Sequence, residues 1–199
     1  NPDAWSPLNS IEVTSPSDPL QNGCIFDGKV YVFSREAMYV IYPSLTTGGD
    51  MFQVLPTSCN VGMWSRYALT VGDRMWFLSA RGIMETVGGE AVNISQQTLI
   101  RPLFENKQVG SYYPVDWTLV TTADYDFNLR YCEPYLYFCY KDTSGGRSMM
   151  VYHTTMKRWH CMKFPTGVVP TLTFGIQQIH GTSTGLDTYF GSQGGKIYI

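Results

Sequence analysis

The chain has 199 residues, which suits one domain or two small ones and is long enough to bury a core. Its net charge is −2 with scattered basic residues, which argues against a nucleic-acid-binding face, and no apolar run approaches the ~20 residues of a membrane span. Aromatic and charged residues each make up 15%, a balance that favours sheets and large contact surfaces over long solvated helices.

Residues 1–22 are predicted to form an N-terminal arm or linker. This stretch is rich in serine and asparagine and holds four prolines, which are typical of loops: Pro2, Pro7, Pro16 and Pro19. One short strand is predicted within it, at Ile11–Thr14. The chain starts at Asn1 and not at methionine, so we expect a processed or trimmed product or part of a longer chain.

A short aromatic and β-branched motif recurs four times after the arm. It reads GKVYVFS at 28–34, DRMWFLS at 73–79, PYLYFCY at 134–140 and GLDTYFGS at 185–192. A loose repeat of about 40–50 residues made of strands is typical of β-propeller blades. We therefore predict an all-β domain over residues 23–199, a β-propeller or partial propeller of about four small antiparallel sheets. The expected blades are 23–58, 61–95, 127–164 and 171–199.

Turn signals separate the predicted strands. The Asp27-Gly28 turn between two apolar runs is a strong hairpin signal, and Gly72-Asp73 and Gly88-Gly89 divide the second block in the same way. The last block offers only three strands. Either the strand at Ile11–Thr14 supplies the fourth, or the chain is cut within that block.

A long connection is predicted from Gln96 to Asp126, with one helical turn near residues 97–99. Loops of this length are often functional. Aromatic residues in linker or loop segments are our candidates for contacts with partner proteins: Trp5, Tyr112, Tyr113 and Trp117. Trp76 and Trp159 lie within strands and are predicted to be core residues.

Two patterns resemble catalytic or metal-binding motifs. Residues 181–185 match Gly-x-Ser-x-Gly beside His180, but a strand-like run follows instead of a helix, so we predict a hairpin loop. Asp124, Asp126 and Asn128 are spaced like calcium ligands, without the glycine at position six and the glutamate at position twelve. A structural cation there is one interpretation, and ordinary turn residues are the favoured one.

The other candidate ligands show no metal-site spacing. The three histidines are not grouped, and none of the five cysteines forms a Cys-x-x-Cys pair. Such cysteines are typical of reduced, mostly buried thiols made in a cytoplasm, with a Cys24–Cys59 disulfide as the alternative. We therefore predict no catalytic residue, no metal site and no cofactor.

Three stretches resemble structural proteins of tailed bacteriophages. They are FLSARGIMETVGGEAVNIS at 77–95 followed by IRPLF at 100–104, VYHTTMKRW at 151–159, and FGSQGGKIY at 190–198. The resemblance covers about residues 23–199 and rests on packing and turn motifs; the hairpin from Tyr152 to Trp159 is also similar to kelch-type propellers. Members of the phage family form β-propeller parts of tail tubes, nozzles and head-to-tail connectors. The resemblance implies a location in the virion after synthesis in the host cytoplasm.

The leading hypothesis is a non-enzymatic virion structural protein that acts by subunit assembly. Its partners would be other virion proteins and further copies of itself, contacted by the arm and by the loop at 96–126. The alternative is a carbohydrate-binding propeller that uses exposed tryptophan and tyrosine. A third hypothesis, a glycoside-active enzyme, needs two carboxylates ~5–10 Å apart. The available ones are Glu85, Glu90, Asp116 and Asp124.

Overall fold

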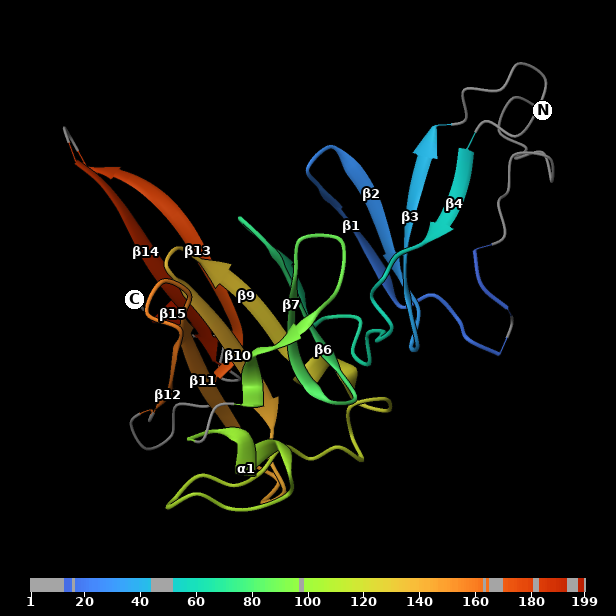
Figure 1. Ribbon diagram of the computed structural model, residues 1–199. Coiled ribbons are helices and arrows are strands. Elements are labelled where there is room, and N and C mark those ends of the chain that lie inside the picture. The colour runs from blue at the N-terminus through green and yellow to red at the C-terminus, as the bar shows by residue number, and fades with distance from the viewer. Residues whose placement is uncertain are drawn as a thin grey trace, which may run out of the picture.

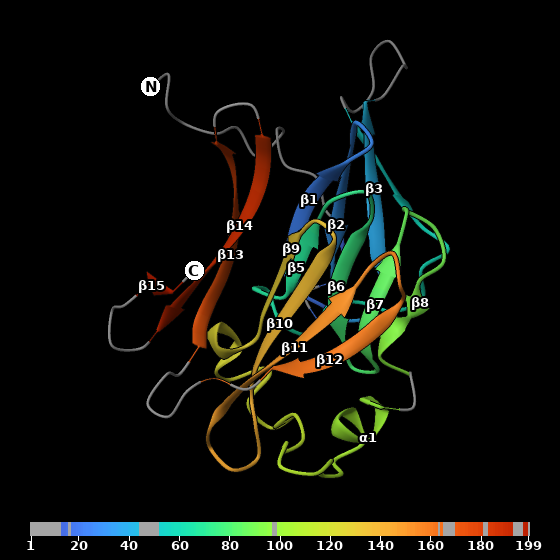
Figure 2. The same ribbon diagram turned by 90° about the vertical axis from the view of Figure 1, so that its left-hand side faces the viewer.

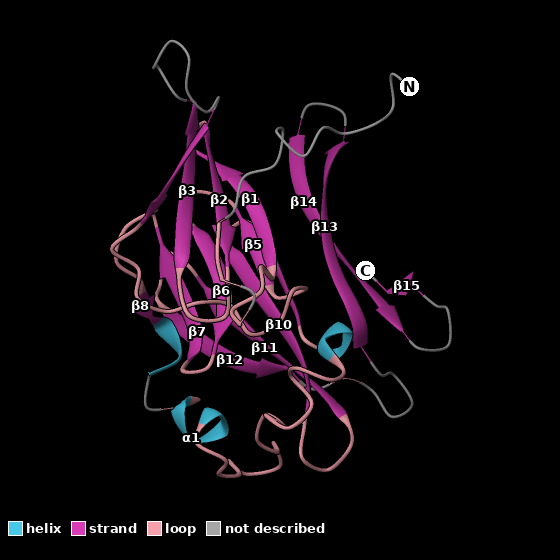
Figure 3. Cartoon of the chain, turned by 90° about the vertical axis from the view of Figure 1, so that its right-hand side faces the viewer, coloured by secondary structure: helices cyan, strands magenta, loops and turns pink. Residues whose placement is uncertain are grey.

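The computed structural model describes residues 13–15, 17–43, 52–96, 99–162, 164, 170–180, 183–192 and 197–198. Strands dominate this part of the chain, and only short helical turns interrupt them there (Figure 3). The prediction of an all-β protein with small antiparallel sheets is confirmed. Trp5 lies outside the described residues, as do residues 11 and 12 of the predicted strand in the arm, while Val13–Ser15 is not in a strand.

Four sheets follow one another along the chain, and each has its strands in sequence order (Figure 1). The first sheet holds β1 (Asn22–Phe26), β2 (Lys29–Phe33), β3 (Met38–Pro43) and β4 (Phe52–Pro56). The second holds β5 (Leu69–Val71), β6 (Met75–Ser79), β7 (Gly82–Thr86) and β8 (Val92–Asn93). The third holds β9 (Asn128–Cys132), β10 (Tyr135–Lys141), β11 (Arg147–His153) and β12 (Arg158–Met162). The fourth holds β13 (Pro170–His180), β14 (Ser183–Ser192) and β15 (Ile197–Tyr198).

The first strands of successive sheets touch. β1 contacts β5, β5 contacts β9, and β9 contacts β13. Figures 1 and 2 show the resulting row, with the first sheet at one end and the β13–β14 hairpin at the other. One face of the first sheet therefore lies against the second sheet, and its opposite face has no further sheet beside it among the described residues.

Local turn chemistry explains the first hairpin. Asp27 and Gly28 both have positive φ, at 48° and 70°, which is the conformation that a two-residue hairpin turn requires. Phe26 pairs directly with Lys29 across the turn, as the sequence predicted. In the fourth sheet, His180 pairs with Ser183, so the predicted hairpin at the Gly-x-Ser-x-Gly pattern is also confirmed, while residues 181 and 182 lie outside the described part.

Two large apolar clusters hold the sheets together. The cluster between the first and second sheets is built around Phe33, Met38, Met63, Met75 and Phe77. A larger cluster joins the second and third sheets and includes Trp76 and Trp159, so both tryptophans are core residues as predicted.

The connection before the third sheet is more ordered than the sequence indicated. It contains the 3-10 turns η2 (Ile94–Gln96) and η3 (Asp124–Asp126) and the helix α1 (Arg101–Phe104). Pro102 lies in the first turn of α1, where its missing N–H costs no hydrogen bond. Leu103 and Val115 are buried in the larger cluster. This segment therefore closes one end of the core instead of forming a free loop.

Candidate association surface

The face of the first sheet that points away from the second sheet is almost wholly apolar. Directly paired residues of an antiparallel sheet share a face, and the pairs Ile25–Val30, Val32–Tyr39 and Ile41–Val54 place these side chains together. The outer face, as we call this surface, consists of Gly23, Ile25, Val30, Val32, Tyr39, Ile41, Pro43, Phe52, Val54 and Pro56. None of these residues carries a charge.

Several of these side chains are widely exposed. The exposed fraction is 71% for Ile25, 47% for Phe52 and 41% for Val30. A sheet with one solvated face usually alternates apolar and polar residues, whereas apolar residues at successive positions are typical of a sheet covered on both faces. Among the described residues, the outer face therefore has the composition of a buried surface but is partly exposed to solvent, which makes it the candidate association surface.

The outer face is absent from the predicted contact residues, although the sequence holds a signal for it. The runs KVYVF at 29–33 and MYVIY at 38–42 are apolar at nearly every position, where the strand of a half-exposed sheet would alternate. Such runs indicate strands, and they also indicate that both faces of those strands are covered. The indication that both faces are covered is the one that suggests a partner.

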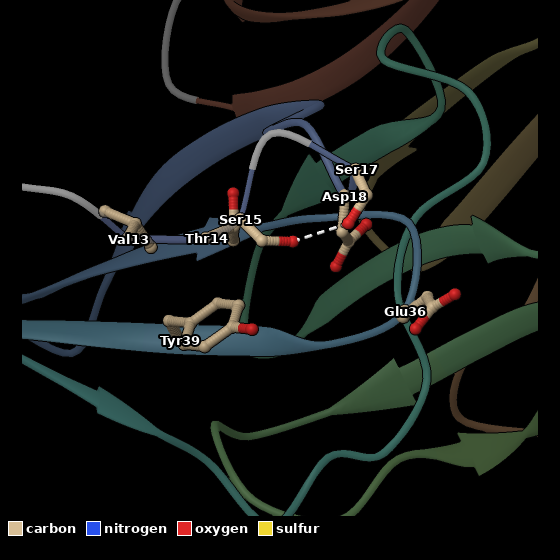
Figure 4. Close-up of a pocket in the computed structure, with 7 residues that line it drawn as sticks. All are labelled: Val13, Thr14, Ser15, Ser17, Asp18, Glu36 and Tyr39. Carbon is tan, nitrogen blue, oxygen red and sulfur yellow. Dashed lines mark hydrogen bonds between the residues drawn. The ribbon is translucent and has the colours of Figure 1, made fainter.

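A shallow hollow borders the outer face beside Tyr39. It has a volume of about 700 Å³ and is lined by Val13, Thr14, Ser15, Ser17, Asp18, Glu36 and Tyr39 (Figure 4). The segment around Asp18 is tied to the first sheet, because the Asp18 carboxylate accepts a hydrogen bond from the Arg35 backbone N–H at 2.9 Å. In Figure 4, Val13, Thr14 and Ser15 lie on one side of the hollow and Tyr39 lies on the opposite side. This border is polar, in contrast to the outer face itself.

The structure describes three of the four predicted contact residues, and it does not gather these three into one surface. Tyr112 is half-buried and donates its hydroxyl to the Cys161 carbonyl at 3.3 Å. The Trp117 indole donates to the Phe104 carbonyl at 3.0 Å and lies edge-on to Trp64. Only Tyr113, with an exposed fraction of 42%, presents its ring to solvent. Tyr112 and Trp117 thus anchor the connection to the core, and contact with a partner stays a prediction for all three.

Replacing Trp117 by phenylalanine should lower the free energy of unfolding by about 1 kcal/mol, because the indole N–H bond to the Phe104 carbonyl is lost. The matched change at an exposed aromatic, Tyr113→Ser, should stay within about 0.5 kcal/mol of the parent. Urea denaturation of the two variants measures the difference. Equal losses would mean that the Trp117 indole does not anchor this segment.

A buried carboxylate joins the second and third sheets. Glu85 on β7 has a side chain only 8% exposed, and its Oε2 accepts a hydrogen bond from the Trp76 indole at 3.0 Å. Its Oε1 lies 3.3 Å from the Arg74 guanidinium and 3.4 Å from the Lys157 ammonium. Lys157 comes from the turn between β11 and β12, so this contact crosses between the sheets. A second bond across the same junction runs from the Trp159 indole to the Ile94 carbonyl, at 2.9 Å.

Tyr152 lies beside this carboxylate and shares with it a hollow of about 480 Å³. Burial is the main cause that raises the pKa of Tyr152 from 10.0 to about 12; the nearby Glu85 carboxylate adds to this, and Arg74 acts in the opposite direction. The folded protein therefore holds the phenolic proton more tightly than the unfolded chain does. Stability from this group is complete below pH 10 and is lost as the pH rises toward about 12.

We expect the free energy of unfolding to fall above pH 10, and to fall less steeply in Tyr152→Phe, which has no phenolic proton to lose. The decline should persist in part, because burial also raises the pKa of Tyr31 and Tyr131. Urea denaturation at a series of pH values gives the two slopes. If the free energy of unfolding falls equally steeply with pH in the parent and the variant, Tyr152 has the same pKa in the folded and the unfolded chain.

Two of the carboxylates considered for glycoside chemistry are engaged in other contacts. Glu85 is engaged on both oxygens as described, and the Asp116 carboxylate accepts bonds from the Thr118 backbone N–H and hydroxyl at 3.1 and 2.6 Å. Glu90 is exposed in the turn before β8, and the side chain of Asp124 lies outside the described part.

Two of the three side chains considered for a structural cation have protein partners, and the side chain of Asp124 lies outside the described part. The Arg147 guanidinium pairs with the Asp126 carboxylate, and the Asn128 amide donates to the Tyr125 carbonyl at 2.7 Å. Among the described residues, no three His, Cys, Asp or Glu side chains are grouped to hold a metal ion. The disulfide alternative also fails, because Cys24 and Cys59 are both free thiols.

No family model matches the chain, and no curated protein matches its sequence. In the part of the chain that the structure describes, no helix has the length and apolar character needed to cross a bilayer.

Proposed function

We propose that this chain is a non-enzymatic structural subunit of a tailed-bacteriophage virion, in a tail or connector, and that it acts by associating with neighbouring subunits. The observation that carries the proposal is the outer face of the first sheet, which is apolar and uncharged and, among the described residues, partly exposed. Covering such a surface is favourable by roughly 25 cal/mol for each Å² of apolar area removed from water. The sequence resemblance to phage structural proteins supports the assignment to a virion.

The proposal includes a partial β-propeller as the architecture. Three sheets have four strands in meander order, which is the content of a propeller blade. The first strands contact one another in the series β1, β5, β9 and β13, as the inner strands of neighbouring blades do. In such an arrangement the outer face of the first sheet is the end of the row and the natural place for a neighbour to continue it.

A firm junction between sheets suits a subunit whose task is to hold a shape. Two bonds between residues far apart in sequence tie the second sheet to the third. One joins the side chains of Glu85 and Lys157, and the other runs from the Trp159 indole to the Ile94 backbone carbonyl. Apolar packing joins the first sheet to the second, with the rings of Phe33 and Phe77 4.9 Å apart. The outer face is therefore presented on a supported sheet.

Quantitative mass spectrometry of gradient-purified virions tests this function. We expect peptides of this chain in the particle fraction, in a fixed ratio to the other tail or connector proteins and retained after a high-salt wash, since apolar contacts resist salt. Recovery of the chain only from the soluble fraction of infected cells would overturn the proposal. The carbohydrate-binding alternative rests on exposed tyrosines such as Tyr113 and Tyr125, and binding to a glycan array tests it separately.

A further inference from the structure

We propose that the partner of the outer face is the outer face of a second copy of this chain, in a two-fold symmetric, sheet-on-sheet contact. This inference rests on the proposed function and deepens it by naming the partner. It concerns the surface formed by Ile25, Val30, Val32, Tyr39, Ile41, Phe52 and Val54.

Charge makes this surface compatible with itself. A two-fold interface brings the same patch of both subunits together, so any charge near the axis meets a like charge of the other copy. The outer face holds no charged residue, and the whole chain carries a net charge of only −2. Two copies can therefore approach through the centre of this face without like-charge repulsion, and the carboxylates of Asp18 and Glu36 lie in its border.

The shape of the surface suits the packing of two sheets. Sheets stack face to face about 10 Å apart, with apolar side chains from both inner faces interdigitating. The outer face supplies one such layer on four paired strands, β1 to β4. The inner face of the same sheet is already used in this way against the second sheet, through Phe33 and Met38.

The size of the surface sets the strength of the contact. Four strands about 4.8 Å apart, each five or six residues long, give a footprint of about 19 by 17 Å, or roughly 300 Å². Two copies would bury roughly 600–1,000 Å² of accessible surface, which is below the standard protein interface of ~1,200–2,000 Å². We therefore expect a weak, reversible dimer with a dissociation constant on the order of micromolar.

Sedimentation velocity on the full chain, from about 1 to about 300 µM, tests the contact over the affinities of small interfaces. The parent should shift from monomer to dimer with concentration. Val30→Lys should weaken dimerisation at least ~10-fold, because it buries a charge against a copy of itself. The matched control, Val92→Lys, makes the same change at a position 63% exposed on β8 of the second sheet and should dimerise like the parent.

A second variant guards against misfolding. If circular dichroism shows that Val30→Lys does not fold, Ile25→Lys takes its place, because Ile25 is 71% exposed and tolerates a long side chain in the monomer. A parent that stays monomeric throughout the range would overturn the inference, as would equal weakening by Val30→Lys and Val92→Lys. A monomeric parent that Ile25→Lys destabilises would mean that the chain covers this face itself, which also overturns it.

The two proposals fail in different ways. If the parent is monomeric but the chain is present in purified virions, the proposed function stands and the partner is another virion protein. If the dimer forms as expected but the chain is absent from virions, the docking surface stands and the virion function falls.

Discussion

Replacing Gly62 with alanine should strongly destabilise the protein. Gly62 is buried in the linker between the first and second sheets, and a Cβ atom at this position would lie well under 3.0 Å from the backbone carbonyl of Arg35 and the backbone nitrogen of Glu36. Backbone atoms cannot turn aside as the end of a flexible side chain can. One of the two segments must move, although they are joined next to this site by the hydrogen bond from Met63 N–H to the Ser34 carbonyl, at 2.8 Å.

The expected loss is about 3 kcal/mol in the free energy of unfolding, or a melting temperature lower by about 6–12 °C for a chain of this size. Gly89→Ala is the matched control, because its new Cβ would meet only the Ser58 hydroxyl at 3.4 Å, an ordinary contact. That variant should stay within about 0.5 kcal/mol of the parent. Thermal and urea denaturation measure both. A tolerated Gly62→Ala would show that the linker does not approach the turn after β2 as closely as described.

Replacing Glu85 with leucine should have the next largest effect. The Trp76 side chain is fully buried, and its indole N–H has the Glu85 carboxylate as its acceptor. Leucine leaves this donor without a partner, at a cost of about 1–3 kcal/mol. The ion pairs to Arg74 and Lys157 are lost as well, but these cations are half exposed and can regain water, so they add little.

Glu85→Gln separates the two contributions, because its amide oxygen can still accept the Trp76 bond while the negative charge is removed. We expect this variant to lose less than about 1 kcal/mol, and less than Glu85→Leu, which should lose about 1–3 kcal/mol. Urea denaturation near neutral pH gives both values. If glutamine costs as much as leucine, the charge pairs and not the indole bond hold this junction together.

Local signals were sufficient for much of the fold. The turn at Asp27-Gly28 has the positive φ angles that its residue types allow, and the strand of the first repeat, at 29–33, follows it directly. Trp159 is buried, as a tryptophan within a strand should be. Turn chemistry and apolar patterning depend on neighbouring residues, so one sequence can reveal them.

The features least visible in the sequence depend on contacts between distant residues. Glu85 and Lys157 are 72 positions apart, and neither shows in the sequence that it faces the other. Trp117 lies between strands, which predicts an interface residue, yet its indole bonds to the carbonyl of Phe104 in α1. The outer face could not be predicted for a related reason. Apolar residues on both faces of a strand indicate that both faces are covered, but they do not indicate which face lies at the end of a row of sheets.

Hydroxyl-radical labelling read by mass spectrometry tests most directly whether the outer face is the surface that assembly covers. It compares the free chain at low concentration with the chain in purified virions. We predict that labelling of Phe52 and Ile25, both widely exposed in the free chain, drops severalfold in the virion. Unchanged labelling of Phe52 and Ile25 in the virion would contradict the proposed role of this surface, because the outer face would then lie open in the assembled particle.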